Sequence, residues 1–139
     1  MRHSSRASAV PADARDAIDR LLVGYALYLD SGDVDACCDL FVEDCEFVIS
    51  DGRRVDGRDA LHRFLATGRE RGAAGIHLPG PALVDLAGDG KTASVWQSFL
   101  FVANGSNTIV RGMYRDITEF DGERWRFRRR HIEIYPGPR

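Results

Sequence analysis

Three side chains in this sequence have types and positions that could carry out acid–base chemistry. Asp30 lies in the last turn of a helix that apolar spacing predicts over Asp13 to Asp30, and Ser31-Gly32 follows it as a helix stop. A carboxylate at this end faces the exposed carbonyl dipoles, which costs roughly a few tenths of a kcal/mol or more. We attribute this unfavourable placement to chemistry, in which Asp30 works with His77 and Tyr25 inside a small-molecule pocket.

An Asp30–His77 pair would be a carboxylate–imidazole pair. A buried aspartate fixes the tautomer of the histidine ring and raises its basicity. Histidine, with an unperturbed pKa of about 6.5, can remove a proton next to a carbonyl or imine and return it to a leaving hydroxyl. Tyr25 would polarise the carbonyl or hold the developing enolate oxygen. We expect elimination of water, isomerisation or intramolecular aldol closure, and none of these reactions needs a cofactor.

Each of the three residues also has a purely structural interpretation. His77 could open a strand and hydrogen-bond to the backbone, and Asp30 could bond to the loop after its helix. Tyr25 lies on the apolar stripe of the first helix, where core packing is the ordinary role.

The elements that must position these residues follow from periodicity and turn signals. Asp33 is a favoured N-cap for a second helix near residues 34–41, and a third helix is expected at 58–68. A hairpin joins 46–49 to 53–55, and long strands follow at 76–86, 92–103, 108–120 and 124–135. Prolines in the first long strand predict an edge strand or a bulge. Helices followed by an antiparallel meander indicate an α+β fold, in which a curved sheet encloses an apolar pocket around three N-terminal helices.

Further pocket residues are predicted from the facing of these elements. Phe64 lies on the inner face of the third helix, and Trp96 and Tyr114 lie on strands expected to form the pocket wall. His131 alternates with Trp125 and Phe127 along the last strand, so it either lines the pocket or faces a subunit contact. The last strand also carries an arginine cluster, Arg124 to Arg130, whose preferred interpretation is an exposed sheet face or subunit contact.

The overall composition limits the possible partners. The chain has 139 residues, 44% of them hydrophobic, and a formal net charge of −2, which fits a single domain over residues 13–139 after a disordered leader at 1–12. That charge argues against nucleic acid as a partner, and no apolar run is long enough to span a membrane. We expect a cytoplasmic protein that binds a small hydrophobic ligand and no metal. Because both faces of the strand 92–103 are apolar, we also expect a homodimer or homotrimer.

Several local motifs make the chain similar to a known family. They are YALYLDSGD at 25–33, GRDAL at 57–61, IHL at 76–78, GMYRD at 112–116 and DGERWRF at 121–127. With the order of elements, these motifs resemble the SnoaL-like family of the nuclear transport factor 2-like superfamily, which has a cystatin-like α+β cone and includes dehydratases of scytalone and bile acids. The resemblance covers roughly residues 13–135.

The resemblance implies roles for the same three residues. In the dehydratase-like members an aspartate ending the first helix, a histidine opening the first long strand and a tyrosine line the pocket, and these positions match Asp30, His77 and Tyr25. The chain departs from the family pattern where Trp96 replaces a second histidine and Glu133 replaces an arginine. The resemblance therefore implies a cofactor-free lyase, isomerase or cyclase for a polyketide, steroid or terpenoid. It leaves two alternatives: a protein that only binds a small molecule, or an assembly subunit resembling the β subunit of ring-hydroxylating dioxygenases.

Overall fold

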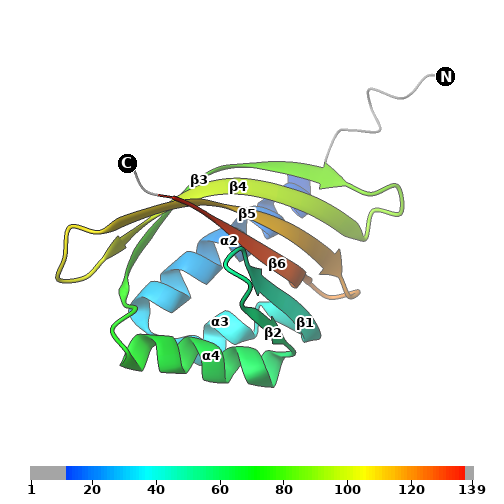
Figure 1. Cartoon of the computed structure of the whole chain (residues 1–139). Coiled ribbons are helices and arrows are strands. Elements are labelled where there is room, and N and C mark those ends of the chain that lie inside the picture. The colour runs from blue at the N-terminus through cyan, green and yellow to red at the C-terminus, as the bar shows by residue number, and fades with distance from the viewer. Residues whose placement is uncertain (1–11, 137–139) are drawn as a thin grey trace.

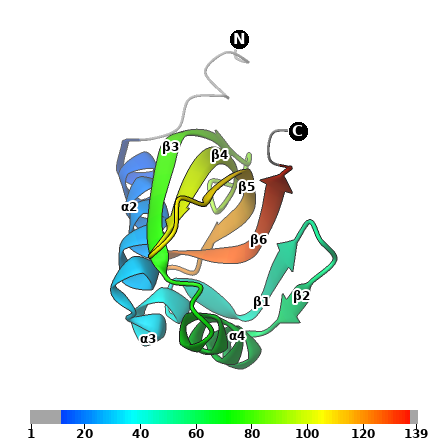
Figure 2. The same ribbon diagram turned by 60° about the vertical axis from the view of Figure 1, so that its left-hand side comes forward.

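A six-stranded sheet curls around three helices in the computed structural model, which describes residues 12–136. The helices are α2 (Ala12–Ser31), α3 (Val34–Cys38) and α4 (Arg58–Glu70). Figure 1 shows the sheet arching over α2, and Figure 2 shows α3 and α4 at the open side of the arch. The expected α+β fold is confirmed. The predicted leader at 1–12 lies outside the described residues, apart from Ala12 in the first turn of α2.

The strand order is β2-β1-β6-β5-β4-β3. The strands are β1 (Phe41–Ile49), β2 (Arg54–Asp56), β3 (Gly75–Leu86), β4 (Thr92–Ala103), β5 (Ile109–Phe120) and β6 (Trp125–Tyr135). All neighbours are antiparallel except β1 and β6, which run parallel. As the prolines predicted, β3 is an edge strand, and its register shifts by one residue between Pro79 and Ala82.

Helix α2 packs its apolar stripe into the sheet. Ile18, Leu22 and Tyr25 are at most 3% exposed, and the helix contacts β3 and β6. Glycine ends the helix as predicted: Gly32 has a φ of 86°, a left-handed conformation that favours glycine. Asp33 caps α3, accepting a hydrogen bond from the backbone N–H of Ala36 at 3.1 Å.

The second helix is shorter than predicted, and the prediction that it reaches Phe41 is wrong. Phe41 instead begins β1, where it is fully buried and pairs with Phe127 of β6. Its ring lies 4.9 Å from that of Phe127, so tertiary packing overrides the local helical pattern. Within residues 12–136, no helix is both long and apolar enough to cross a membrane.

Candidate active site

Asp30 and His77, 47 residues apart in sequence, meet where the end of α2 approaches the start of β3. The Nδ1 atom of His77 lies 2.6 Å from Oδ1 of Asp30, and the backbone N–H of His77 donates to Oδ2 at 2.9 Å. The same carboxylate therefore holds both the ring and the backbone of His77. The side chains are 14% and 16% exposed, so the pair is shielded from most solvent.

The end of α2 accommodates the acidic residue through two compensating contacts. Arg69 of α4 donates from Nη1 to the carbonyl of Leu29 at 2.7 Å, which places a cation at the negative end of the helix dipole. The backbone N–H of His77 neutralises part of the charge of Asp30. The cost expected from the helix end alone is thus offset by neighbours from α4 and β3.

The hydrogen bond to Asp30 determines which nitrogen of His77 is free. A carboxylate can only accept, so Nδ1–H donates to Asp30 and Nε2 is left with a lone pair. Asp30 raises the pKa of His77 as expected, but burial has the larger and opposite effect. Burial lowers the pKa of His77 below 6.5, and the hydrogen bond and charge of Asp30 only partly oppose this fall, while Arg130 adds to it. His77 is therefore neutral at pH 7 and able to accept a proton.

His77 opens onto a cavity of about 760 Å³ between α4, the end of α2 and the concave face of the sheet. Three other predicted residues, Tyr25, Tyr114 and Phe64, also line this cavity. The ring of Tyr25 lies edge-on to His77, with centroids 6.1 Å apart. Asp30 does not line the cavity but lies behind His77, which makes it an orienting group.

Tyr25 and Tyr114 form the floor of the cavity and remain protonated. Their rings are 5.8 Å apart, and burial raises the pKa of both phenols above 10. A buried neutral phenol is a hydrogen-bond donor. Phe99 stacks on Tyr114 at 4.3 Å, which adds a flat aromatic surface to the wall.

Beneath this floor lies an ion pair that sequence reasoning missed. Arg130 donates from Nε and Nη2 to the two carboxylate oxygens of Asp116, both at 2.9 Å, and both side chains are completely buried. The guanidinium carbon also lies 4.3 Å from the ring centre of Tyr25, 3.7 Å from that of Tyr114 and 4.4 Å from that of Phe127. Burial raises the pKa of Asp116, and the pairing with Arg130 opposes that rise. A fixed positive charge therefore lies directly behind the two phenols.

His131 does not line the cavity of His77: of the two facings that the sequence left open, the structure has the outer one, and a β-bulge explains why. The register between β5 and β6 shifts between Ile117 and Thr118, where Arg128 is the extra residue on β6. Trp125 and Phe127 face inward before the bulge. After it, Arg130 and Ile132 do so instead, which puts His131 on the outer face.

The prediction that Trp96 forms part of the pocket wall is wrong. Trp96 pairs across the sheet with Arg115 on the outer face, and it lines a separate hollow of about 250 Å³ there with Arg115, Arg129 and His131. Alternation along β4 shows only that residues 96 and 99 lie on opposite faces, not which face is concave. Interpreting the arginine cluster as exposed is likewise wrong for Arg130, although Arg124, Arg126 and Arg128 form surface ion pairs. A usable signal for the buried pair was Asp116, which lies two residues from Tyr114 and thus on the same face.

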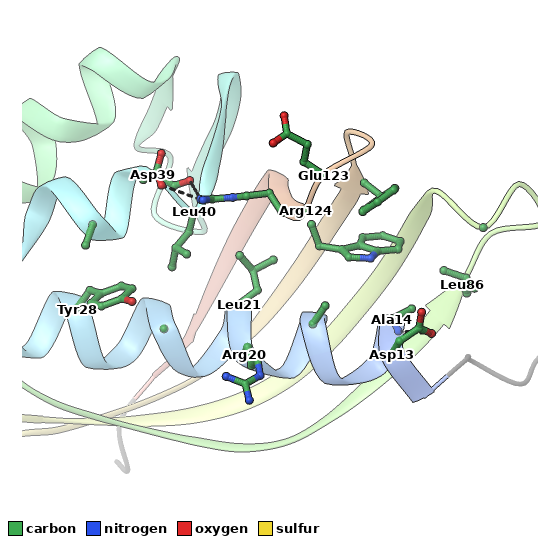
Figure 3. A pocket seen from close by; sticks show the side chains of 16 residues that line it. Asp13, Ala14, Arg20, Leu21, Tyr28, Asp39, Leu40, Leu86, Glu123 and Arg124 are labelled. Atoms are coloured by element: carbon green, nitrogen blue, oxygen red, sulfur yellow. Dashed lines mark hydrogen bonds and ion pairs between the residues drawn. The ribbon is translucent and has the colours of Figure 1, made fainter.

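A second hollow of about 670 Å³ runs along the other side of α2 (Figure 3). Its two arginines already have partners: Arg124 donates to Asp39 at 2.8 Å, as Figure 3 shows, and Arg20 pairs with Asp16 at 3.0 Å. No histidine lines it. Its contents therefore offer less chemistry than the His77 cavity. Across the part of the chain that the structure describes, no cluster of three potential metal-binding side chains occurs.

Comparison with known proteins supports the same fold. Among solved structures, an NTF2-like protein with a cystatin-like fold from Novosphingobium aromaticivorans is 27% identical, with a TM-score of 0.79 over 91% of this chain and 84% of that chain. A candidate scytalone dehydratase from N. aromaticivorans DSM 12444 is 25% identical, with a TM-score of 0.77 over 88% of this chain and 84% of that chain.

A third solved structure extends the likeness of fold to a different kind of protein. The β subunit of a candidate aromatic-ring-hydroxylating dioxygenase from N. aromaticivorans DSM 12444 is 23% identical, with a TM-score of 0.76 over 91% of this chain and 92% of that chain. No curated protein matches the sequence. The model of the SnoaL-like domain matches residues 11–131. The chain therefore belongs to the SnoaL-like family and has the NTF2-like fold.

Proposed function

We propose that the protein is a cofactor-free lyase, isomerase or cyclase that acts on a hydrophobic, oxygenated small molecule. The observation that carries the proposal is the 2.6 Å contact between Nδ1 of His77 and Asp30. It leaves Nε2 of a neutral imidazole as the base in an apolar cavity.

The residues around His77 suggest how such a reaction would proceed. Nε2 of His77 takes a proton from a carbon next to a carbonyl, and Asp30 stabilises the imidazolium that forms. The phenols of Tyr25 and Tyr114 donate hydrogen bonds to the carbonyl oxygen as it gains negative charge. In a dehydration, Nε2–H then returns the proton to a hydroxyl that leaves as water. In an isomerisation it returns the proton to a different carbon.

The shape and lining of the cavity support a hydrophobic substrate. A volume of about 760 Å³ is within the usual range for drug-sized ligands. The walls are mostly aromatic and aliphatic, with Phe47, Phe99, Phe101 and Ile132 among them. A fused-ring polyketide, steroid or terpenoid with a carbonyl near a hydroxyl would match this lining.

The test is turnover by the wild-type protein and matched variants on a panel of hydrophobic β-hydroxyketones in D₂O. Loss of water and deuterium uptake at the carbon next to the carbonyl would be followed by mass spectrometry. His77→Ala and Asp30→Asn should each abolish turnover with the fold retained by circular dichroism. Full activity in both variants would contradict the mechanism.

The chain provides a matched control for these variants. His62 and Asp35 form a second imidazole–carboxylate contact, also at 2.6 Å, but on the surface and outside the cavity. His62→Ala removes the same chemical group without touching the site, so its turnover should equal that of the wild type.

A second candidate function is ligand binding without chemistry. Among the described residues that line the cavity, His77 is the only imidazole and no carboxyl group is present, so no second imidazole or carboxyl group would act beside His77. Tight binding of the panel compounds with no product from the wild-type protein would favour this candidate over the first.

A further inference from the structure

Four arginines line the cavity of His77: Arg53, Arg63, Arg69 and Arg71. Arg53, Arg63 and Arg71 are exposed, whereas Tyr25, Phe47, Leu65, Phe99, Tyr114 and Ile132 in the same lining are buried. The arginines therefore form the rim of the cavity, and the apolar side chains form its interior.

Two of the rim arginines already have structural roles. Arg69 donates to the carbonyl of Leu29 and closes the end of α2. Arg53 pairs with Asp51 at 2.8 Å and lies 5.8 Å from the ring centre of Phe64. Arg63 and Arg71, in contrast, form no ion pair and no side-chain hydrogen bond with any residue of the described range 12–136. Their charge is available to a ligand.

The positive charge of the rim does not reflect the charge of the whole chain. The chain has 21 acidic and 19 basic residues and a net charge of −2, yet no carboxylate belongs to the cavity lining. A cleft lined by charges of one sign beside low-dielectric walls concentrates the opposite charge at its mouth. A neutral hydrophobic ligand would leave these two cations unused.

We propose that the ligand of this cavity is an amphipathic anion, with an apolar body inside and a carboxylate, sulfonate or phosphate group at the Arg63–Arg71 rim. The rim places the acidic end outside and the apolar body toward His77 and the phenol floor. The proposal rests on the proposed function only in taking the same cavity as the substrate site. It narrows the substrate class to hydrophobic acids, or to hydrophobic compounds carried on an acidic group.

The test uses two fluorescent probes that differ by one anionic group. The probe 8-anilinonaphthalene-1-sulfonate is anionic, and N-phenyl-1-naphthylamine has the same aromatic body without the sulfonate. Wild-type protein should bind the sulfonate more tightly, and this preference should decline between 50 and 500 mM NaCl because the rim is solvent-exposed. Each of Arg63→Gln and Arg71→Gln should weaken sulfonate binding roughly two- to fivefold, and the double variant on the order of tenfold. Binding of the neutral probe should not change.

Arg20→Gln is the matched control, because it removes an exposed arginine from the other hollow (Figure 3). Equal binding of the two probes, no binding of either, or a loss caused by Arg20→Gln but not by the rim variants would each overturn the proposal. These outcomes are separable from the proposed function, since His77→Ala should retain sulfonate binding even where turnover is lost. Turnover that survives His77→Ala would instead refute the chemistry and leave the charge preference standing.

Discussion

The buried pair of Asp116 and Arg130 leads to a quantitative prediction about stability. Both side chains have no exposed surface and share two hydrogen bonds of 2.9 Å. Arg130→Met fills a similar volume but leaves Asp116 buried without its cation. Removing one partner of such a pair costs about 3–5 kcal/mol of the free energy of unfolding, because an uncompensated charge remains in the interior. The loss of three ring contacts to the guanidinium adds to this cost.

The double variant Arg130→Met/Asp116→Leu should recover most of the lost stability, because replacing both partners by apolar groups removes the buried charge altogether. The assay is urea unfolding followed by circular dichroism, with slopes compared to confirm a common unfolded state. Arg20→Met, at a side chain 81% exposed, should change stability by less than about 0.5 kcal/mol. The reasoning fails if Arg130→Met costs less than about 1 kcal/mol, or if the double variant is no more stable than the single one.

Three further predictions concern other parts of the molecule. Because burial lowers the pKa of His77, its NMR titration midpoint and the acid limb of any activity should lie below pH 6.5, and Asp30→Asn should move the midpoint lower still; a midpoint above 6.5 would contradict this. Because the histidine of the unfolded chain binds a proton at a higher pH than His77 does in the folded protein, the free energy of unfolding should fall as the pH falls through 6.5. The three cysteines are buried and burial raises the pKa of each thiol, so a disulfide reagent should modify none of them until urea unfolds the chain. Leu83 and Leu100 are 66% and 41% exposed on the outer face of the sheet, so light scattering should detect a dimer or trimer that the double substitution to aspartate converts to monomers.

Much of the fold could be predicted because glycine turns and apolar periodicity are local signals. The long strands begin and end within a residue of their predicted bounds, and turns at Gly52, Gly90 and Gly122 have the positive φ that such signals require. The fate of Phe41 could not be predicted in the same way. Its strand position depends on Phe127, 86 residues later, and no local pattern reports that contact.

The candidate site, too, could be predicted where its signals are local and could not where they are not. The end of α2 and the start of β3 were each recognisable, so Asp30 and His77 could be named, although only the three-dimensional structure gives their distance. The inner face of β6 could not be predicted, because alternation assumes an unbroken pleat and Arg128 interrupts it. His131 and Arg130 exchange faces for that single reason.

The extra residue in β6 also divides the last strand into two halves: odd-numbered residues face inward before Arg128, and even-numbered residues face inward after it. The half before Arg128 closes the core around Phe41 and Phe127, and the half after it supplies Arg130 and Ile132 beneath and beside the cavity. Because Thr118 pairs with Phe127 and Ile117 with Arg129, loss of Arg128 would leave an unbroken ladder in which every remaining side chain of β6 keeps its face. In evolutionary terms, the bulge is therefore removable: a single-codon deletion of Arg128 would give up its ion pairs with Asp44 and Glu119 but leave Ile132 on the cavity side and His131 on the outer face.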